Sequence, residues 1–507
     1  MVNRFIKLVL FYGCIITTQS LHAQFIYNVT IIDGTGAAPF KGSIRIKKDK
    51  IIAIGNIKAA SDEQVIDGKG LVLTPGFIDS HSHHFSSLQQ DPKGVPNASQ
   101  GVTTIVIGQD GEGEMMDTLQ SILSKQPVAI NVASYTGHSS LRERVMGEKN
   151  VLRKATPMEI EQMRSLLLKD LNNGSLGLST GLEYEQAFYS AKEEVMDLAK
   201  LTATQRGRYI SHIRSEDVTI EDAMNEIIDI GRETKMPVQV AHIKIGMQSK
   251  WGKSIYFIDQ LNKARAEGIN ITADVYPYNF WNSTLRVLFP ARDYSNLESA
   301  EFAVKELFDP TASVLVQYAP MPSYKGKTLA AVAKERNETP AQTLIYLVAL
   351  AADFKKNNPN FKGTVEAIAA KGMSDQDVAN FIAWPYANIC SDGNTAGHPR
   401  GYGSFTKVLG KYVREEKLLT LTEAVHKMTG LSAEHLGLKK RGIIAVGNYA
   451  DLVLLNPETV IDNATIDNSK ALSTGIEMVW VNGQLIYKDQ KATGHIPGVL
   501  IKRDADL

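Results

Sequence analysis

The sequence predicts an α/β fold, a (β/α)8 barrel of the TIM type, with a small β domain built from both chain ends. Eight short apolar segments alternate with helix-like segments through the middle of the 507 residues, an order typical of parallel βαβ units that close into a barrel. At both ends of the chain, apolar and polar residues alternate in short segments, as expected for strands with one exposed face.

The predicted barrel strands lie within residues 76–84, 102–110, 127–138, 175–184, 208–216, 237–246, 269–278 and 387–394. After the seventh of them, residues about 285–385 carry too few strand signals for their length. We therefore expect a largely helical insertion there. Long excursions of this kind are usually functional and often act as lids.

The β domain is expected from residues 24–75 and 441–507, which flank a barrel that spans residues 76–440. The first part reads FIYNVTIID, SIRIKKDKIIAIG and QVIDGKGLVLTPG, with Asp-Gly and Gly turns between the strands. The second part contains ADLVLLN and GIEMVWVNGQLIYK, in which Val-Asn-Gly-Gln is typical of a hairpin turn. We expect the two parts to build one sheet domain together.

Residues 1–23 have the pattern of a signal peptide. Arg4 and Lys7 precede the apolar run LVLFYGCIITT, and LHA before Gln24 resembles a small-residue cleavage site. The run is shorter than the roughly 20 apolar residues that a membrane-spanning helix needs. Cys14 lies in a poor context for lipidation, between Gly13 and Ile15. We therefore expect export to the periplasm or the medium, without membrane insertion after the signal is removed.

The charge balance points to a small molecule as the partner. Residues 24–507 hold 53 basic side chains, the 55 of the whole chain less Arg4 and Lys7, and 55 acidic ones. Since there is no basic block, nothing favours a nucleic acid or an anionic membrane as the partner. Cys390 is the one cysteine after residue 23, so no intrachain disulfide can form.

Histidine and aspartate recur where the predicted strands end. His81 and His83 are two residues apart, so on a strand both point to the same face. His212, His242 and Asp392 end the fifth, sixth and eighth strands. A single histidine pair would be weak, because buried histidines often only satisfy a hydrogen bond. Together at the catalytic face of a barrel, these residues predict a zinc or similar divalent metal site with a position open for water.

The combined motifs resemble the amidohydrolase superfamily. PGFIDSHSHH together with His212, His242 and Asp392 matches the pattern of that superfamily. SLGLSTGLEY, YISHIRSE, VAHIKIG, ADVYPY and SDG followed by HPRGYGSF are similar to its N-acyl-D-amino-acid deacylase (D-aminoacylase) branch. The resemblance runs from about residue 27 to the C-terminus. It implies a TIM barrel with a β-sandwich built from both chain ends, and hydrolysis of N-acyl-D-amino acids to a carboxylate and a free D-amino acid.

One ligand position departs from the branch. Members typically carry a metal-binding cysteine after the second strand, where this chain has Asp110 in GQDG. A carboxylate can also ligate or bridge zinc, and Glu183 in GLEY is a second candidate for the bridge. Either residue could instead have an ordinary role, Asp110 in an Asp-Gly turn and Glu183 in a salt bridge. One or two Zn²⁺ ions are expected, and another divalent metal is compatible with the loss of sulfur.

The resemblance also assigns roles around the metal. Asp392 would act as general base and then as general acid toward the leaving amine. The substrate carboxylate calls for cations and hydroxyl donors. The residues implied for this binding are Tyr184, Lys244, Tyr276, Ser283 and Arg400, with Asn282 as the alternative to Ser283. His138 and Arg142, in GHSSLRERV, are candidates for the pocket or for the start of a helix.

Two rival functions remain open from the sequence. The same metal centre could serve a peptidase that releases C-terminal D-residues, or a cyclic amidase. A barrel that had lost its metal could also persist as a non-catalytic scaffold.

Overall fold

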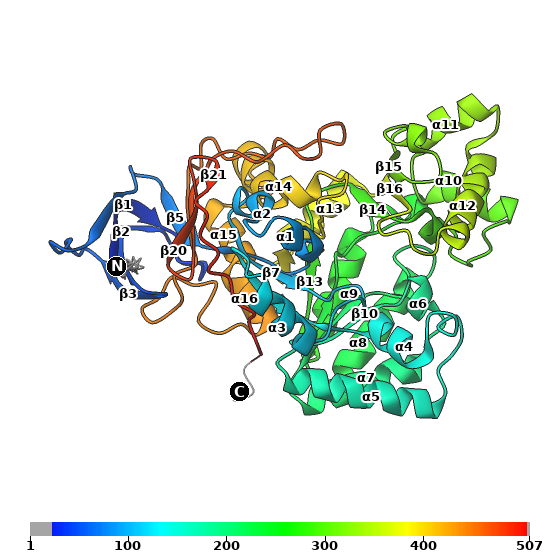
Figure 1. Ribbon diagram of the computed structural model, residues 1–507, viewed down its shortest axis with the longest axis horizontal. Helices are drawn as coiled ribbons and strands as arrows, with labels where there is room; N and C mark the ends of the chain where they lie inside the picture. Colours follow the sequence, from blue (N-terminus) through cyan, green and yellow to red (C-terminus); the bar gives the residue numbers. More distant parts are fainter. Residues whose placement is uncertain (1–22, 504–507) are drawn as a thin grey trace, which may run out of the picture.

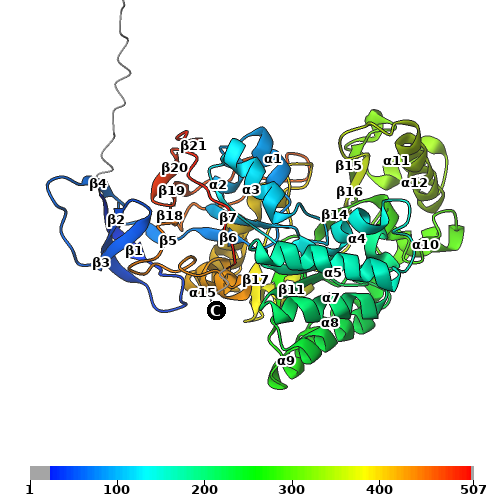
Figure 2. The same ribbon diagram turned by 60° about the horizontal axis from the view of Figure 1, so that its bottom comes forward.

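The structure is a computed structural model that describes residues 23–503 (Figure 1). The predicted signal peptide lies outside the described residues, apart from its last position. A sheet formed by both chain ends occupies one end of the elongated molecule, and helices of the segment before β17 (Ala387–Ile389) occupy the other (Figures 1 and 2). The central parallel strands lie between these two parts.

The central parallel strands form two sheets that continue into one another. Their orders are β6-β7-β8 and β17-β13-β12-β11-β10-β9, and every pair is parallel. The remaining strands are β6 (Phe77–Asp79), β7 (Val102–Ile107), β8 (Asn131–Ser134), β9 (Thr136–Gly137), β10 (Gly177–Gly181), β11 (Arg208–His212), β12 (Val238–Val240) and β13 (Ile271–Val275). Only Tyr135 separates β8 from β9, and a parallel bridge joins Ser82 to Gly393 beyond β6 and β17. The strand ends therefore follow one another around a common centre.

Hydrophobic burial explains these strands. Every residue of β7, VTTIVI, is buried, as expected for a strand of a parallel sheet that is covered on both faces. β-Branched residues favour this extended, packed environment. The connecting helices α4, α5, α7, α8 and α9 lie along the outside of the strands (Figure 2). The alternation of strand and helix that the sequence predicts is therefore present.

The helices that connect or follow the central strands are short to medium in length. They are α1 (Phe85–Gln90), α2 (Val95–Ala98), α3 (Met116–Lys125), α4 (His138–Met146), α5 (Pro157–Asn172), α6 (Glu185–Phe188), α7 (Lys192–Thr204), α8 (Ile220–Thr234), α9 (Ser254–Ala266), α13 (Asp375–Ala383), α14 (Arg400–Lys407), α15 (Leu421–Met428) and α16 (Gly430–Leu436). Thr156 and Glu159 form a capping box that begins α5. Across residues 23–503, no helix combines the length and apolar character that a membrane span requires.

Strands from both chain ends form a single sheet of nine strands. Its order is β21-β20-β19-β18-β5-β1-β2-β3, with β4 paired to β1. The strands are β1 (Gln24–Ile31), β2 (Phe40–Lys47), β3 (Lys50–Gly55), β4 (Gln64–Asp67), β5 (Val72–Pro75), β18 (Leu452–Leu455), β19 (Ile476–Val481), β20 (Gln484–Lys488) and β21 (Lys491–Ala492). The antiparallel pairing of β5 with β18 joins the strands of the two chain ends.

The segment between β13 and β17 has its own sheet and its own hydrophobic core. It contains α10 (Leu297–Glu306), α11 (Leu329–Arg336), α12 (Pro340–Asn357) and an antiparallel sheet of β14 (Phe280–Ser283), β16 (Glu366–Lys371) and β15 (Val314–Tyr318). Leu288, Leu315, Leu344 and Ile368 are buried in this core. The helices were expected from the sequence, but β15 and β16 were missed; the alanine-rich EAIAAK of β16 has the composition of a helix.

His138 and Arg142 lie in a buried network on α4. Arg142 donates to both carboxylate oxygens of Glu194 on α7, at 2.5 and 2.7 Å, and His138 Nε2 lies 2.9 Å from the same carboxylate. Burial raises the pKa of Glu194, but His138 and Arg142 outweigh that effect and hold it below its usual value. The structure thus joins these two residues to Glu194 as a link between helices.

We expect Glu194→Ala to lower the free energy of unfolding by about 3–5 kcal/mol, because it leaves the buried guanidinium of Arg142 without a counter-charge. Urea unfolding followed by circular dichroism measures the change. The matched control is Glu114→Ala, which removes the partner of the exposed Arg144 and should shift stability by no more than about 0.5 kcal/mol. Equal effects of the two substitutions would contradict this interpretation.

Candidate metal centre

The predicted site residues meet where the central parallel strands end. Three of them, Asp110, His242 and Asp392, have left-handed backbone conformations, with φ of 57°, 34° and 47°. Such conformations cost about 1–2 kcal/mol for a residue other than glycine, and they collect at functional sites. The packing around these three residues must therefore offset the cost of their backbone conformations.

Close contacts at two glycines fix the conformation of the loop that carries Asp110. A Cβ atom on Gly181 would lie 2.0 Å from the carbonyl oxygen of Asp110, and one on Gly111 would lie 2.7 Å from Ser139 Oγ. Gly111 also has a φ of 78°, which favours glycine. The loop after β7 therefore packs directly on the end of β10, and Asp110 enters the centre of the strand ends.

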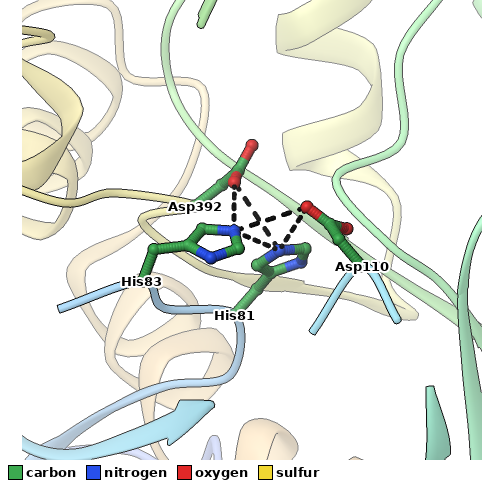
Figure 3. A group of neighbouring side chains, drawn as sticks. All are labelled: His81, His83, Asp110 and Asp392. Carbon is green, nitrogen blue, oxygen red and sulfur yellow. Dashed lines mark hydrogen bonds and ion pairs between the residues drawn. The ribbon is translucent and has the colours of Figure 1, made fainter. Parts of the chain in front are cut away.

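A first group contains His81, His83, Asp110 and Asp392 (Figure 3). The Nε2 atoms of His81 and His83 are 3.3 Å apart. Asp110 Oδ2 lies 3.5 and 3.4 Å from these two nitrogens, and Asp392 Oδ1 lies 3.5 and 3.3 Å from them. All four ligand atoms thus point to one small space.

A second group contains Asp110, His212 and His242. His212 Nδ1 and His242 Nε2 are 3.0 Å apart, and Asp110 Oδ1 lies 3.9 and 3.1 Å from them. Asp110 therefore presents one oxygen to each histidine pair, Oδ2 to the first group and Oδ1 to the second. This is the geometry of a bridging carboxylate.

Glu183 lies on the other side of His212. Its Oε2 is 2.8 Å from His212 Nε2, the ring nitrogen that faces away from Asp110. Glu216 Oε1 is 3.0 Å from His242 Nδ1, and Lys244 Nζ lies 2.6 Å from the same nitrogen. A carboxylate that accepts from the outer ring nitrogen fixes the tautomer and orientation of a histidine that binds metal through the inner one. Glu183, His212 and Glu216 also form a third group with metal-binding side chains.

The carboxylates make the centre strongly negative. Burial and Lys244 lower the pKa of His242, but Glu216, Asp110 and Asp392 outweigh them and raise it to about 10. Burial also opposes protonation of His83, whose pKa Asp110 and Asp392 raise to about 10. The charges around both rings thus favour a cation at this place.

The donor set fits a divalent metal. In a tetrahedral shell with Zn–N and Zn–O bonds of about 2.0–2.1 Å, neighbouring ligand atoms lie about 3.3–3.4 Å apart. The distances of 3.3–3.5 Å in the first group agree with that spacing. The inner nitrogens of the second group are 3.0 Å apart, and the group has three donors, which leaves a coordination position open.

Two cations lie beside the centre and flank the ring of Tyr276. Lys244 Nζ donates to both oxygens of Glu216, at 2.7 and 2.8 Å. Arg400 Nη1 donates to Asp392 Oδ2 at 2.6 Å, while its Nη2 makes a long contact of 3.4 Å to a backbone oxygen. Arg400 and the other charges near Asp392 overcome the effect of burial and hold the pKa of that carboxyl well below its usual value. Lys244 and Arg400 lie 5.8 and 4.8 Å from the Tyr276 ring centroid.

Two connected cavities open from the centre. The inner pocket, about 60 Å³, reaches Lys244, Tyr276, Asp392 and Arg400. The outer chamber, about 740 Å³, lies between the strand ends and the insertion; it is lined by residues such as Glu112, Gln186, Arg286, Lys355 and Thr364. The inner pocket is small and has charged residues in its lining, and the outer chamber is much larger.

Tyr184, Asn282 and Ser283 line both cavities. The Tyr184 ring centroid lies 4.4 Å from that of His212, and burial raises the pKa of this tyrosine well above its usual value, so it remains a neutral donor. Asn282 Oδ1 is buried and has no hydrogen-bond partner within residues 23–503. The structure thus places both alternatives of the sequence analysis, Asn282 and Ser283, at the cavities.

Two residues near the centre were not predicted from the sequence. Glu216 lies four positions after His212 in HIRSE, and that spacing beside a predicted ligand was an available signal. Asp274 is the penultimate residue of β13; it accepts from the backbone nitrogen of His242 at 2.6 Å and lies 3.8 Å from His81 Nδ1. It had no signal beyond its place at a strand end.

Curated relatives cover nearly the whole chain. A D-aminoacylase of Alcaligenes xylosoxydans xylosoxydans is 32% identical over 94% of this chain and 96% of its own length. An N-acyl-D-glutamate deacylase of the same organism is 31% identical over the same shares, and an N-acyl-D-aspartate deacylase is 32% identical over 95% and 96%.

Solved structures of similar deacylases also match over nearly the whole chain. A crystal structure of D-aminoacylase superposes with a TM-score of 0.83 at 31% identity, covering 95% of this chain and 99% of the other. An N-acyl-D-glutamate deacylase of Bordetella bronchiseptica, in complex with zinc and a phosphonate that mimics the tetrahedral intermediate, superposes with a TM-score of 0.84 at 30% identity. The shares covered are 95% and 100%.

A family model described as the amidohydrolase family matches residues 64–345 and 371–487, which include every residue of the three groups above. The chain therefore belongs to the amidohydrolase family.

Proposed function

We propose that the protein is a metal-dependent hydrolase that cleaves the amide bond of N-acyl-D-amino acids. The observation that carries this proposal is the pair of histidine sets that share the two oxygens of Asp110, with Asp392 beside them. The relatives at about 30% identity act on N-acyl-D-amino acids, as their names state, and they span almost the whole chain. Chirality rests on these relatives, because nothing in the donor set distinguishes D from L.

Zn²⁺ is the ion that the donor set and the zinc complex of the Bordetella relative support, and one or two ions fit the groups. His81, His83 and Asp392 would hold one ion and His212 and His242 the other, with Asp110 as the bridge. A bound divalent ion lowers the pKa of a coordinated water and polarises the scissile carbonyl. Glu183 and Glu216 orient the second histidine pair.

Asp392 moves the proton. Its carboxylate remains ionised beside Arg400, and its Oδ1 faces the space between His81 and His83. From there it accepts a proton from the attacking water and returns it to the leaving nitrogen, which would otherwise leave as a poor amide anion. Tyr184, next to His212, is placed to donate to the substrate carbonyl oxygen.

The amino-acid end of the substrate belongs in the inner pocket. Lys244, Arg400 and the hydroxyl groups of Tyr276 and Ser283 provide donors for the α-carboxylate. The acyl end then extends into the outer chamber, whose volume also admits acyl groups larger than acetyl.

The chain organisation proposed from the sequence accompanies this function. Residues 76–440 form a closed (β/α)8 barrel, and the site lies where the barrel strands end. Residues 285–385 form an insertion over that site. Residues 24–75 and 441–507 form the β-sandwich domain. The joined strand order supports the barrel, and the sheet of both chain ends supports the second domain. A signal peptide over residues 1–23 would place the enzyme in the periplasm or the medium.

We expect amine release from N-acetyl-D-amino acids and none above background from the L-enantiomers, with loss of release after chelation and recovery with zinc. The measurement uses the chain from Gln24 onward on matched panels of both enantiomers. No release from either panel by protein with bound metal would contradict the proposal. Release of D-residues from peptides or of acids from cyclic amides would then support the rival functions.

We expect Asp110→Ala to remove all bound zinc and His83→Ala to remove at most one ion, because Asp110 contacts both groups and His83 contacts the first group. Metal analysis after gel filtration gives the number of ions per chain. Asp259→Ala, at an exposed site on α9, is the control and should retain the wild-type number. Retention of both ions by Asp110→Ala would contradict the bridge.

We expect Asp392→Asn to lower kcat by about 10²–10⁴-fold, the range for loss of a general acid–base group. The amide retains the shape of the side chain, so the ion held by His212 and His242 should stay bound. Steady-state kinetics and metal analysis of the same preparation test both statements. A kcat within threefold of wild type would assign the proton transfer to another residue.

A further inference from the structure

The guanidinium of Arg400 serves two groups at once. Its Nη1 binds Asp392, and the proposed function also assigns the guanidinium to the α-carboxylate of the substrate. We propose that His398, two residues earlier in the chain, is a positioning residue that fixes the backbone from which Arg400 reaches both groups. This inference rests on the proposed function, and it concerns a residue that lines neither of the two cavities.

His398 supplies a hydrogen-bond acceptor at the start of α14. Arg400 is the first residue of that helix, so the helix itself leaves the backbone nitrogen of Arg400 without a partner. Pro399 precedes it, and its side chain provides no cap. The Nδ1 atom of His398 lies 3.0 Å from the backbone nitrogen of Arg400 and accepts its proton. The first turn of α14 is thereby tied to His398.

This contact also sets the protonation state of the imidazole ring. Nδ1 can accept only when it carries no proton, so the proton of the neutral ring lies on Nε2. Burial and the charge of Arg400 lower the pKa of His398 well below its usual value, and they outweigh the effects of Asp392 and of the Phe280 backbone. The ring therefore remains a neutral acceptor toward Arg400.

The packing around His398 does not require a histidine. The ring is buried and meets the ring of Tyr278 edge to face, with the two centroids 5.6 Å apart. Its Nε2 is buried and has no hydrogen-bond partner within residues 23–503, which is costly for a polar atom. A carbon ring would keep the aromatic contact and avoid that cost. The interaction it would lose is the acceptor for Arg400.

The far end of the Arg400 side chain depends on a fixed backbone. Its bond to Asp392 is short, at 2.6 Å, whereas its Nη2 lies 3.4 Å from the backbone oxygen of Asn282. The guanidinium carbon lies 4.8 Å from the ring centroid of Tyr276. A shift at the start of α14 would therefore move the guanidinium away from the substrate carboxylate. A misplacement of about 1 Å can cost a factor of about 100 in rate.

Two variants of the zinc-loaded enzyme separate the acceptor from the ring. His398→Phe keeps an aromatic ring against Tyr278 but has no acceptor. His398→Asn loses the ring but keeps an acceptor, because an Asn side chain before proline accepts from the backbone N–H two residues further on.

We expect His398→Phe to raise KM for N-acetyl-D-amino acids by about tenfold or more, and His398→Asn to raise it by no more than about threefold. The value of kcat should change less than KM, since the carboxylate is bound alike before and during the reaction. Steady-state kinetics gives both constants. The matched control is His495→Phe, at an exposed position, which should leave KM within about twofold of wild type.

Metal analysis and thermal unfolding accompany the kinetics of each variant. A KM of His398→Asn that equals or exceeds that of His398→Phe would assign His398 to packing and overturn the proposal. A loss confined to kcat would overturn it as well. Failure of His398→Phe to fold or to bind zinc would overturn it too, because a carbon ring would then not fit the packing. No release by the wild-type enzyme from the whole D-panel would instead contradict the proposed function, and this inference with it.

Discussion

The shared carboxylate of Asp110 is the interaction on which the rest of the site depends. Its two oxygens face different histidine pairs, one from the end of β6 and one from the ends of β11 and β12. Without it the two pairs would lack a common ligand. The carboxylate can lie between the two histidine pairs only if its loop packs tightly on β10. The left-handed backbone of Asp110 and the close glycine contacts around it agree with such packing.

Charge is arranged in layers around this carboxylate. Asp392 and Asp110 face the ligand nitrogens, Glu183 and Glu216 bind the outer nitrogens of the second histidine pair, and Lys244 and Arg400 neutralise two of the carboxylates. The result is a place for a cation next to a place for one anionic group. A small inner pocket and a much larger outer chamber adjoin this place, so the two ends of an acylated amino acid meet spaces of different size.

Much of this arrangement follows from local sequence. The family was correctly identified from motifs such as PGFIDSHSHH. Successive parallel strands end on the same side of their sheet, and this brings together His81, His83, Asp110, His212, His242 and Asp392. Long-range pairing was harder to predict. The contact of Glu216 with His242 and Lys244 joins the loop after β11 to the loop after β12. Arg400 and Asp392 follow the same strand, but their contact depends on the path of the chain between them. Strand β16 escaped prediction because its pairing with β14 and β15, rather than its alanine-rich composition, stabilises it. Strand β15, VLVQY, has the composition of a strand and was missed.

The most direct test of the bridging role of Asp110 is a crystal structure of the zinc-loaded protein, with diffraction data collected on both sides of the zinc absorption edge. Two anomalous peaks are expected, one beside His81 and His83 and one beside His212 and His242, with one oxygen of Asp110 within bonding distance of each. A peak held by Glu183, His212 and Glu216, with Asp110 bound to no zinc, would contradict that role.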